Sequence, residues 1–150
     1  MSEALTRCEF QSSELSRNAA AVFYAAEAHP VRVTRRDAEP LILMSERESD
    51  ARKSLFSLAA QLIGVTTDDR GTLTERMQNQ FPWMLALSAD DRDECAKELV
   101  SAARASFATN QPHLATTTLT SWIETAAALA AGHSARAVEW LDEEVPVKRP

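Results

Sequence analysis

The sequence predicts a mixed α+β fold, with a small N-terminal unit of strands and helices followed by an all-helical part. In residues 1–64, short runs that alternate apolar and polar residues at the period of a strand are interspersed with segments of helical period. Residues 65–72, "VTTDDRGT", form a polar connector. Beyond the connector, every apolar run follows the helical period. We therefore expect a β-α-β-β-α domain at residues 1–64 and a helical domain at residues 65–150.

The N-terminal elements follow in order. A strand is expected at residues 6–10, and a helix is expected from Ser12 or Ser13, which can cap it, to His29-Pro30, which ends it. The apolar residues of that helix fall on one face: Leu15, Ala19, Val22, Phe23 and Ala26.

A hairpin is expected next, between residues 31 and 44. Val31 and Val33 alternate with polar residues, and "PLILM" supplies a second apolar strand. Arg35 and Arg36 then lie at or near the tip. Ser45-Glu46-Arg47-Glu48 reads as a capping box that opens a second helix, and Gly64 is expected to end it. The expected inward residues of that helix are Leu55, Phe56, Leu58, Ala59, Leu62 and Ile63.

Four helices are expected in the second part. A short one begins at the cap Thr72–Glu75, and longer ones span residues 88–108 and 113–131. A last helix is expected after residue 134. The expected inward residues are Cys95, Leu99, Ala102, Ala103, Phe107, Leu119, Trp122, Ile123 and Ala126, and those of the last helix are Ala137, Val138, Trp140 and Leu141.

The composition is typical of a folded soluble protein, with 45% apolar and 25% charged residues and a formal net charge of −6. No apolar run approaches the roughly 20 residues that a membrane span needs. The N-terminus, "MSEALTRCEF", lacks a basic segment followed by an apolar core. Two cysteines do not make a disulfide framework. We therefore expect a cytoplasmic protein that makes no membrane contact.

The sequence carries no catalytic signature. Its three glycines form no phosphate-binding loop, and no Gly-x-Ser-x-Gly elbow is present. His29, His113 and His133 are too far apart to have metal-ligand spacing. The acidic cluster at residues 90–94 fits a helix start, where the helix dipole favours anions. We expect no enzymatic activity, no metal and no cofactor.

Two basic groups suit a phosphate-bearing partner. In "SSELSRN", Arg17 and Asn18 bring donors close to an expected helix start, and backbone amides at such a start favour phosphate. Arg35 and Arg36 supply the second group. From the residues alone, the alternative that these arginines are ordinary surface residues stays open.

The segment Ser12 to Glu48, "SSELSRNAAAVFYAAEAHPVRVTRRDAEPLILMSERE", resembles the N-terminal domain of the Phd/YefM family of antitoxins. Three parts carry the resemblance in the family's order: a helix start with Ser13, Arg17 and Asn18; the strand "PVRVTRR"; and an apolar strand that runs into a Ser-x-x-Glu helix start. The resemblance covers residues 5–62.

The resemblance implies a homodimer that binds the operator of its own operon and represses it. It also implies that the C-terminal part binds and neutralises a toxin, commonly a RelE-type ribonuclease or a Doc-type kinase. The DNA contacts that it implies are Arg17, Asn18, Arg35 and Arg36, with Ser13 and Thr34 as secondary candidates. It places Val31, Val33, Leu41 and Leu43 in a shared dimer core.

The sequence departs from the family pattern in two places. The hairpin turn, Arg36-Asp37-Ala38-Glu39, holds no glycine, and about 85 residues with helical signals replace a short C-terminal segment. Phe81, Trp83 and Trp140 are the candidate toxin contacts on that helical part. Two alternatives remain: a stand-alone regulator without a toxin, and a protein-interaction module that uses the fold only to dimerise.

Overall fold

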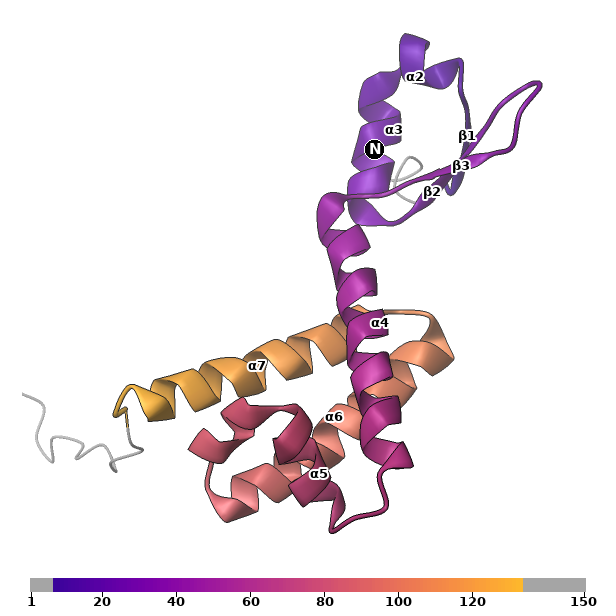
Figure 1. Ribbon diagram of the computed structural model, residues 1–150. Coiled ribbons are helices and arrows are strands. Elements are labelled where there is room, and N and C mark those ends of the chain that lie inside the picture. The colour runs from indigo at the N-terminus through magenta and orange to yellow at the C-terminus, as the bar shows by residue number, and fades with distance from the viewer. Residues whose placement is uncertain (1–6, 134–150) are drawn as a thin grey trace, which may run out of the picture.

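The computed structural model describes residues 7–133 and has a mixed α+β architecture (Figure 1). A small unit of three strands and two short helices lies at one end, and a group of helices lies at the other. The long helix α4 (Glu46–Thr67) joins them. None of the helices in residues 7–133 is both long and apolar enough to cross a bilayer.

The sheet contains β1 (Glu9–Gln11), β2 (Val31–Thr34) and β3 (Leu41–Leu43) in that order. β1 and β2 are parallel, with Phe10 opposite Val33, and β2 and β3 are antiparallel. The strand expected at residues 6–10 therefore begins and ends later, and residues 1–6 lie outside the described part. One face of the sheet packs on α3 (Ala19–Ala28). The core between them contains Phe10, Val22, Ala25, Ala26, Val31 and Val33.

The prediction of one continuous helix after β1 is wrong. The chain forms α2 (Glu14–Arg17) and then α3, and Asn18 separates them with φ −146° and ψ 51°. The Asn18 N–H still donates to the Glu14 carbonyl at 2.7 Å, which completes α2. Ser13 precedes α2 but its side chain makes no capping hydrogen bond. Phe23, expected on the inward face, is 52% exposed.

Helix α4 begins at an N-cap that the sequence predicts. The Ser45 hydroxyl accepts a hydrogen bond from the Glu48 N–H at 3.2 Å. The second hydrogen bond of the predicted capping box, from the Ser45 N–H to the Glu48 carboxylate, is not among the described contacts. The Glu48 carboxylate instead accepts from Arg52 Nε at 2.8 Å and lies 2.7 Å from His113 Nε2. Glu48 is only 8% exposed, so this cluster ties the start of α4 to the start of α7 (His113–Ala130).

Gly64 does not end α4, contrary to the prediction. The helix runs through Gly64 to Thr67, and the predicted division of the chain at residue 64 falls inside it. No atom lies within 4 Å of a Cβ placed on Gly64, and its φ is not positive. Gly64 therefore does not adopt the left-handed, positive-φ conformation through which glycine usually ends a helix.

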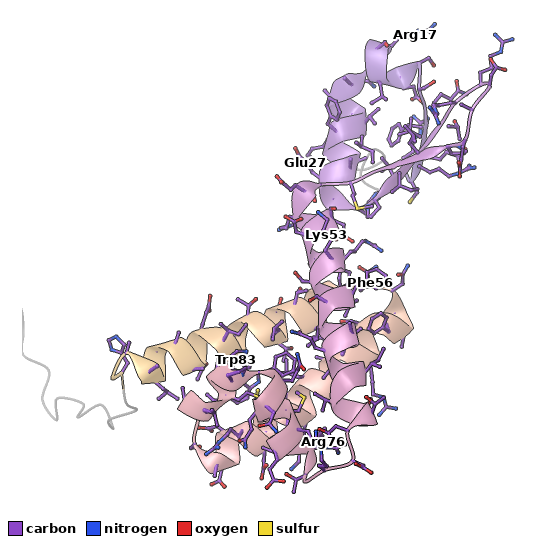
Figure 2. All side chains as sticks on the ribbon, viewed as in Figure 1. Arg17, Glu27, Lys53, Phe56, Arg76 and Trp83 are labelled. Carbon is purple, nitrogen blue, oxygen red and sulfur yellow. The ribbon has the colours of Figure 1, made fainter. Side chains whose placement is uncertain are left out.

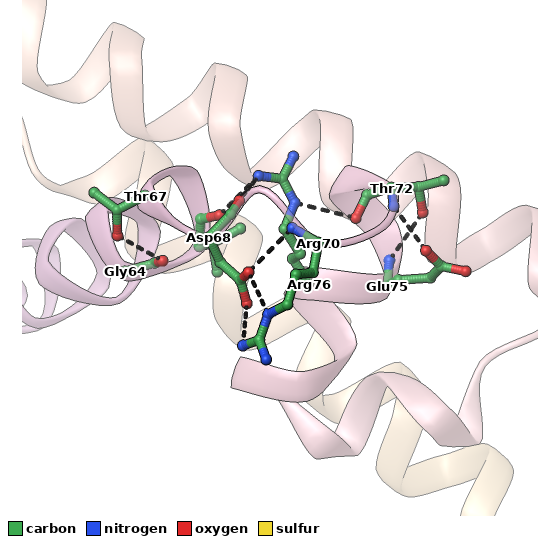
Figure 3. Close-up of polar contacts among 8 residues, drawn as sticks. Gly64, Thr67, Asp68, Arg70, Thr72, Glu75 and Arg76 are labelled. Carbon is green, nitrogen blue, oxygen red and sulfur yellow. Dashed lines mark hydrogen bonds and ion pairs between the residues drawn. The ribbon is translucent and has the colours of Figure 1, made fainter.

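The connector between α4 and α5 (Leu73–Gln80) is held by polar contacts (Figure 3). Arg76 donates to the carbonyl of Val65 at 3.1 Å and also to that of Asp68. The Arg70 guanidinium bonds the Asp68 carboxylate at 2.9 Å and lowers the pKa of that carboxyl to about 2. The predicted cap at Thr72 is confirmed, since Thr72 and Glu75 form a complete capping box.

The remaining helices are the 3₁₀ helix η1 (Pro82–Ala86), α6 (Ala89–Thr109) and α7. They pack with α5 and the second half of α4 around a core of fully buried Leu58, Met77, Met84 and Leu99. This core has no residue in common with that of the sheet unit.

Cys95, Ala102, Ala103 and Ala126 are buried as predicted, whereas Phe56, Ile63, Phe107 and Ile123 are 40–69% exposed, contrary to prediction. The helix predicted after residue 134 lies outside the described residues.

Candidate nucleic-acid interface

A polar hollow of about 380 Å³ lies at the edge of the sheet where β1 and β2 end. Its lining residues come from two segments of the chain: Gln11, Ser12, Ser13, Thr34, Arg35 and Arg36. Parallel pairing places Gln11 opposite Thr34, and the Ser12 N–H donates to the Thr34 carbonyl at 2.8 Å. Because both strands run in the same direction, the residues that follow them meet at one edge.

The two arginines of the hollow differ in their surroundings. Arg35 folds across the hairpin loop, and its Nε donates to the Glu39 carbonyl at 2.8 Å. Arg36 is exposed and makes no ion pair or side-chain hydrogen bond among the described contacts. The Thr34 hydroxyl donates to the Phe10 carbonyl at 3.2 Å, so it is engaged in joining β2 to β1. The guanidinium of Arg36 is thus the donor group best placed to take a new anionic partner.

Acidic groups near the hollow are partly neutralised. Glu14 accepts two hydrogen bonds from the Arg7 guanidinium at 2.8 Å and one from the Gln11 N–H. The hydrogen bonds from Arg7 are the main cause of the lowered pKa of Glu14. Asp37 and Glu39, on the hairpin loop, are exposed and form no ion pair in the described part of the chain. The negative charges of these two acids offset part of the positive charge of the hollow, so its net positive charge is modest.

The structure brings four of the six predicted DNA-contacting residues together. Ser13, Thr34, Arg35 and Arg36 line the hollow. Arg17 and Asn18 are exposed but do not line it. Arg17 is the last residue of α2 and Asn18 follows it, and Figure 2 shows Arg17 at the end of the sheet unit away from α4. The prediction missed Gln11, whose place in the hollow follows from its pairing with Thr34. Ser12 was predicted only as a helix cap and a hydrogen-bond donor.

The sheet unit also exposes large apolar side chains. Phe23 and Tyr24 on α3 are 52% and 47% exposed, and Leu41 and Ile42 on β3 are 53% and 58% exposed. Of the four residues assigned to a shared dimer core, Val31 and Val33 are buried within the single chain. Leu41 is exposed and Leu43 is half-buried.

The two candidate toxin contacts within residues 7–133, Phe81 and Trp83, do not form an exposed patch. Phe81 is 4% exposed and belongs to the helical core, and Trp83 packs against that core with its ring 6.1 Å from the ring of Phe81. Trp140 lies outside the described residues. The apolar residues that the helical part does expose are Phe56, Ile63, Leu85, Phe107, Leu114 and Ile123.

Among residues 7–133, no group of His, Cys, Asp and Glu side chains could hold a metal ion. Comparison with protein-family models, with characterised proteins and with solved structures gave no match.

Proposed function

We propose that this protein is an antitoxin of the Phd/YefM type, which binds operator DNA as a homodimer and neutralises a toxin by direct binding. One observation supports the DNA-binding half most strongly. Two segments more than twenty residues apart in the sequence, both part of the family-like pattern, converge on the hollow that Arg35 and Arg36 line. The residues of that hollow offer guanidinium, hydroxyl and amide donors, which are the groups that bind phosphate oxygens.

In this proposal Arg36 contacts a DNA phosphate or the edge of a guanine. Ser12 and Ser13 donate to the neighbouring phosphate oxygens. Arg35 holds the hairpin loop in position through Glu39, and Arg17 extends the contact along the backbone. An acidic protein can act in this way, because affinity for DNA depends on the charge of the face presented rather than on the total charge.

Dimerisation is proposed to cover the apolar surface of the sheet unit. Exposed Leu41 and Ile42 lie on the edge strand β3, and exposed large apolar side chains gathered in one region mark interaction sites. A second copy packed at this edge would cover these side chains and would present two hollows to two half-sites of an operator.

Toxin binding is proposed for the helical part of the chain, where several large apolar side chains are exposed. The toxin would be a RelE-type ribonuclease or a Doc-type kinase. This assignment rests on the resemblance of residues 5–62.

DNA binding is tested with the segment upstream of the protein's own gene, by fluorescence anisotropy at several salt concentrations. Arg36→Ala is expected to weaken binding and to reduce the salt slope by about one unit, as for the loss of one phosphate contact. Lys97→Ala is the matched control, because Lys97 is an exposed cation on α6, far along the chain from the hollow. If the wild type and Arg36→Ala bind the DNA with equal affinity, the hollow is not part of the DNA-binding surface.

Neutralisation is tested by expressing the adjacent gene alone and together with this chain. The proposal expects growth arrest by the neighbour alone, normal growth with this chain, and copurification of the two products. A neighbour that neither binds nor harms growth would contradict the toxin-binding half while leaving DNA binding intact.

A non-DNA interaction module is the second candidate. The specific observation in its favour is the pair of exposed acids, Asp37 and Glu39, on the same loop as the arginines. On this alternative the dimer forms normally but the upstream DNA is bound no better than an unrelated duplex of equal length.

A further inference from the structure

Among the six residues that line the hollow, Gln11 is the only one with a side-chain amide. It is the last residue of β1, in which Glu9 and Gln11 are exposed and Phe10 between them is buried. Because successive side chains of a strand point to opposite faces, Gln11 lies on the face of the sheet opposite the core. Its amide makes no hydrogen bond among the described contacts, so its donor and its acceptor are both available to a ligand.

The backbone of Gln11 is held firmly, which fixes the point from which its side chain extends. Parallel pairing places Gln11 opposite Thr34 on β2. Its N–H donates to the Glu14 carboxylate at 2.8 Å, and the Arg7 guanidinium holds that carboxylate through two hydrogen bonds of 2.8 Å. A binding group on a strand is placed more precisely than one on a loop, and precise placement favours selective recognition.

The polar groups of the hollow differ in what they can recognise. The Arg36 guanidinium and the hydroxyls of Ser12 and Ser13 suit phosphate oxygens, and a guanidinium also suits the edge of a guanine. An amide presents a donor and an acceptor on separate atoms of one planar group. This pair matches the N7 acceptor and the N6 amino donor that adenine presents in the major groove of DNA. None of the other five lining residues has such a pair in its side chain.

We propose that Gln11 determines sequence specificity by binding an adenine of the operator in the major groove. The amide oxygen accepts a hydrogen bond from the adenine N6 amino group, and the amide nitrogen donates to N7. The other donors of the hollow bind the sugar–phosphate backbone and set its register. Figure 1 shows the loop between β2 and β3 extending away from α3, and a major groove about 12 Å wide admits a two-stranded ribbon. The inference rests on the proposed DNA binding and adds the base that the hollow recognises.

The test compares DNA binding by the full-length wild type and Gln11→Ala, one base pair at a time. Footprinting first locates the segment upstream of the gene that the wild type protects. Every single-base-pair variant of that segment is then measured by fluorescence anisotropy. For the wild type we expect an A·T pair whose replacement weakens binding roughly 5- to 150-fold, as for the loss of one bidentate base contact. For Gln11→Ala the same replacement should change the affinity less than about twofold, while the losses at other positions remain.

Two further variants separate base recognition from other roles. Gln11→Glu keeps the shape of the side chain but replaces the amide donor with an acceptor. The preference at that position should therefore move from adenine to cytosine, whose N4 amino group is a donor. Gln111→Ala is the matched control, because Gln111 is an exposed glutamine between α6 and α7, and it should leave the whole base profile unchanged. The salt slope of Gln11→Ala should equal that of the wild type, since no phosphate contact is lost.

Three results would overturn the assignment of Gln11 while leaving the proposed DNA binding intact. In the first, Gln11→Ala keeps the full wild-type base profile. In the second, it binds every variant more weakly by the same factor, which would mean that Gln11 contacts the DNA backbone. In the third, Gln11→Glu still prefers adenine. A wild type that binds the upstream segment no better than an unrelated duplex would instead contradict the proposed function, and this inference with it.

Discussion

The separation of the two hydrophobic cores leads to a quantitative prediction for Leu99→Ala. Leu99 is fully buried in the middle of α6, in the same core as Leu58, Met77 and Met84. Truncation removes its buried apolar surface and leaves a cavity, because close-packed neighbours relax only partly. For a fully buried leucine the expected loss in the free energy of unfolding is about 3 kcal/mol.

The assay is urea denaturation followed by tryptophan fluorescence. Trp83 and Trp122 both pack against the helical core, so their emission reports its unfolding. Leu85→Ala is the matched control: it is the same chemical change at a side chain that is 60% exposed, and its effect should stay within about 0.5 kcal/mol. DNA binding by Leu99→Ala should be unchanged wherever the variant is folded, because the sheet unit has its own core.

Two outcomes would refute this reasoning. A loss below about 1 kcal/mol for Leu99→Ala would mean that the helical core is not packed at native density. A parallel loss of DNA affinity under conditions where the helical core is still folded would mean that the two cores are coupled despite having no residue in common.

Four other predictions follow from individual residues. Gly64→Ala should stabilise the protein by about 0.5–1 kcal/mol in thermal or urea unfolding, because the site is helical and open. Gly71→Ala should destabilise it, because its φ is +78° and a Cβ would meet the capping carboxylate. Asp68, with its pKa held at about 2 by its arginine partner, stabilises the fold above about pH 4 and loses that effect as the pH falls through 2; Asp68→Asn should flatten acid unfolding in this window. In a thiol titration of the native protein Cys8 should react quickly, and Cys95 slowly, because burial raises the Cys95 pKa to about 12. A fast Cys95 or an unchanged acid transition would contradict these assignments.

The sequence predicted the position of most elements, because their signals are local. Serine or threonine caps mark the starts of α4, α5 and α6, and alternation marks β2. Local signals failed at Asn18, where the chain breaks a helix that periodicity alone would continue, and at Gly64, where the helix continues past a residue typical of a helix end.

The candidate hollow was foreseen only in part. The basic residues and their family-like order are visible in the sequence. That the ends of β1 and β2 meet at Gln11 and Thr34 follows only from the parallel pairing. Arg17 and Asn18, close in sequence to Ser13, lie at the end of α2 and do not line the hollow.

The fold class, the caps of α4, α5 and α6 and the basic segment can be predicted from the sequence, since each depends on residues a few positions apart. Which apolar side chains are covered depends on the tertiary structure. Phe56 and Ile63 lie roughly a third of a turn around α4 from the buried stripe of Leu55, Leu58 and Leu62, and Phe107 lies at a similar angle from Leu99 on α6. Periodicity gives the angle of each side chain about its own helix, but whether that flank meets a neighbour depends on how the helices pack, which is a property of contacts between distant residues.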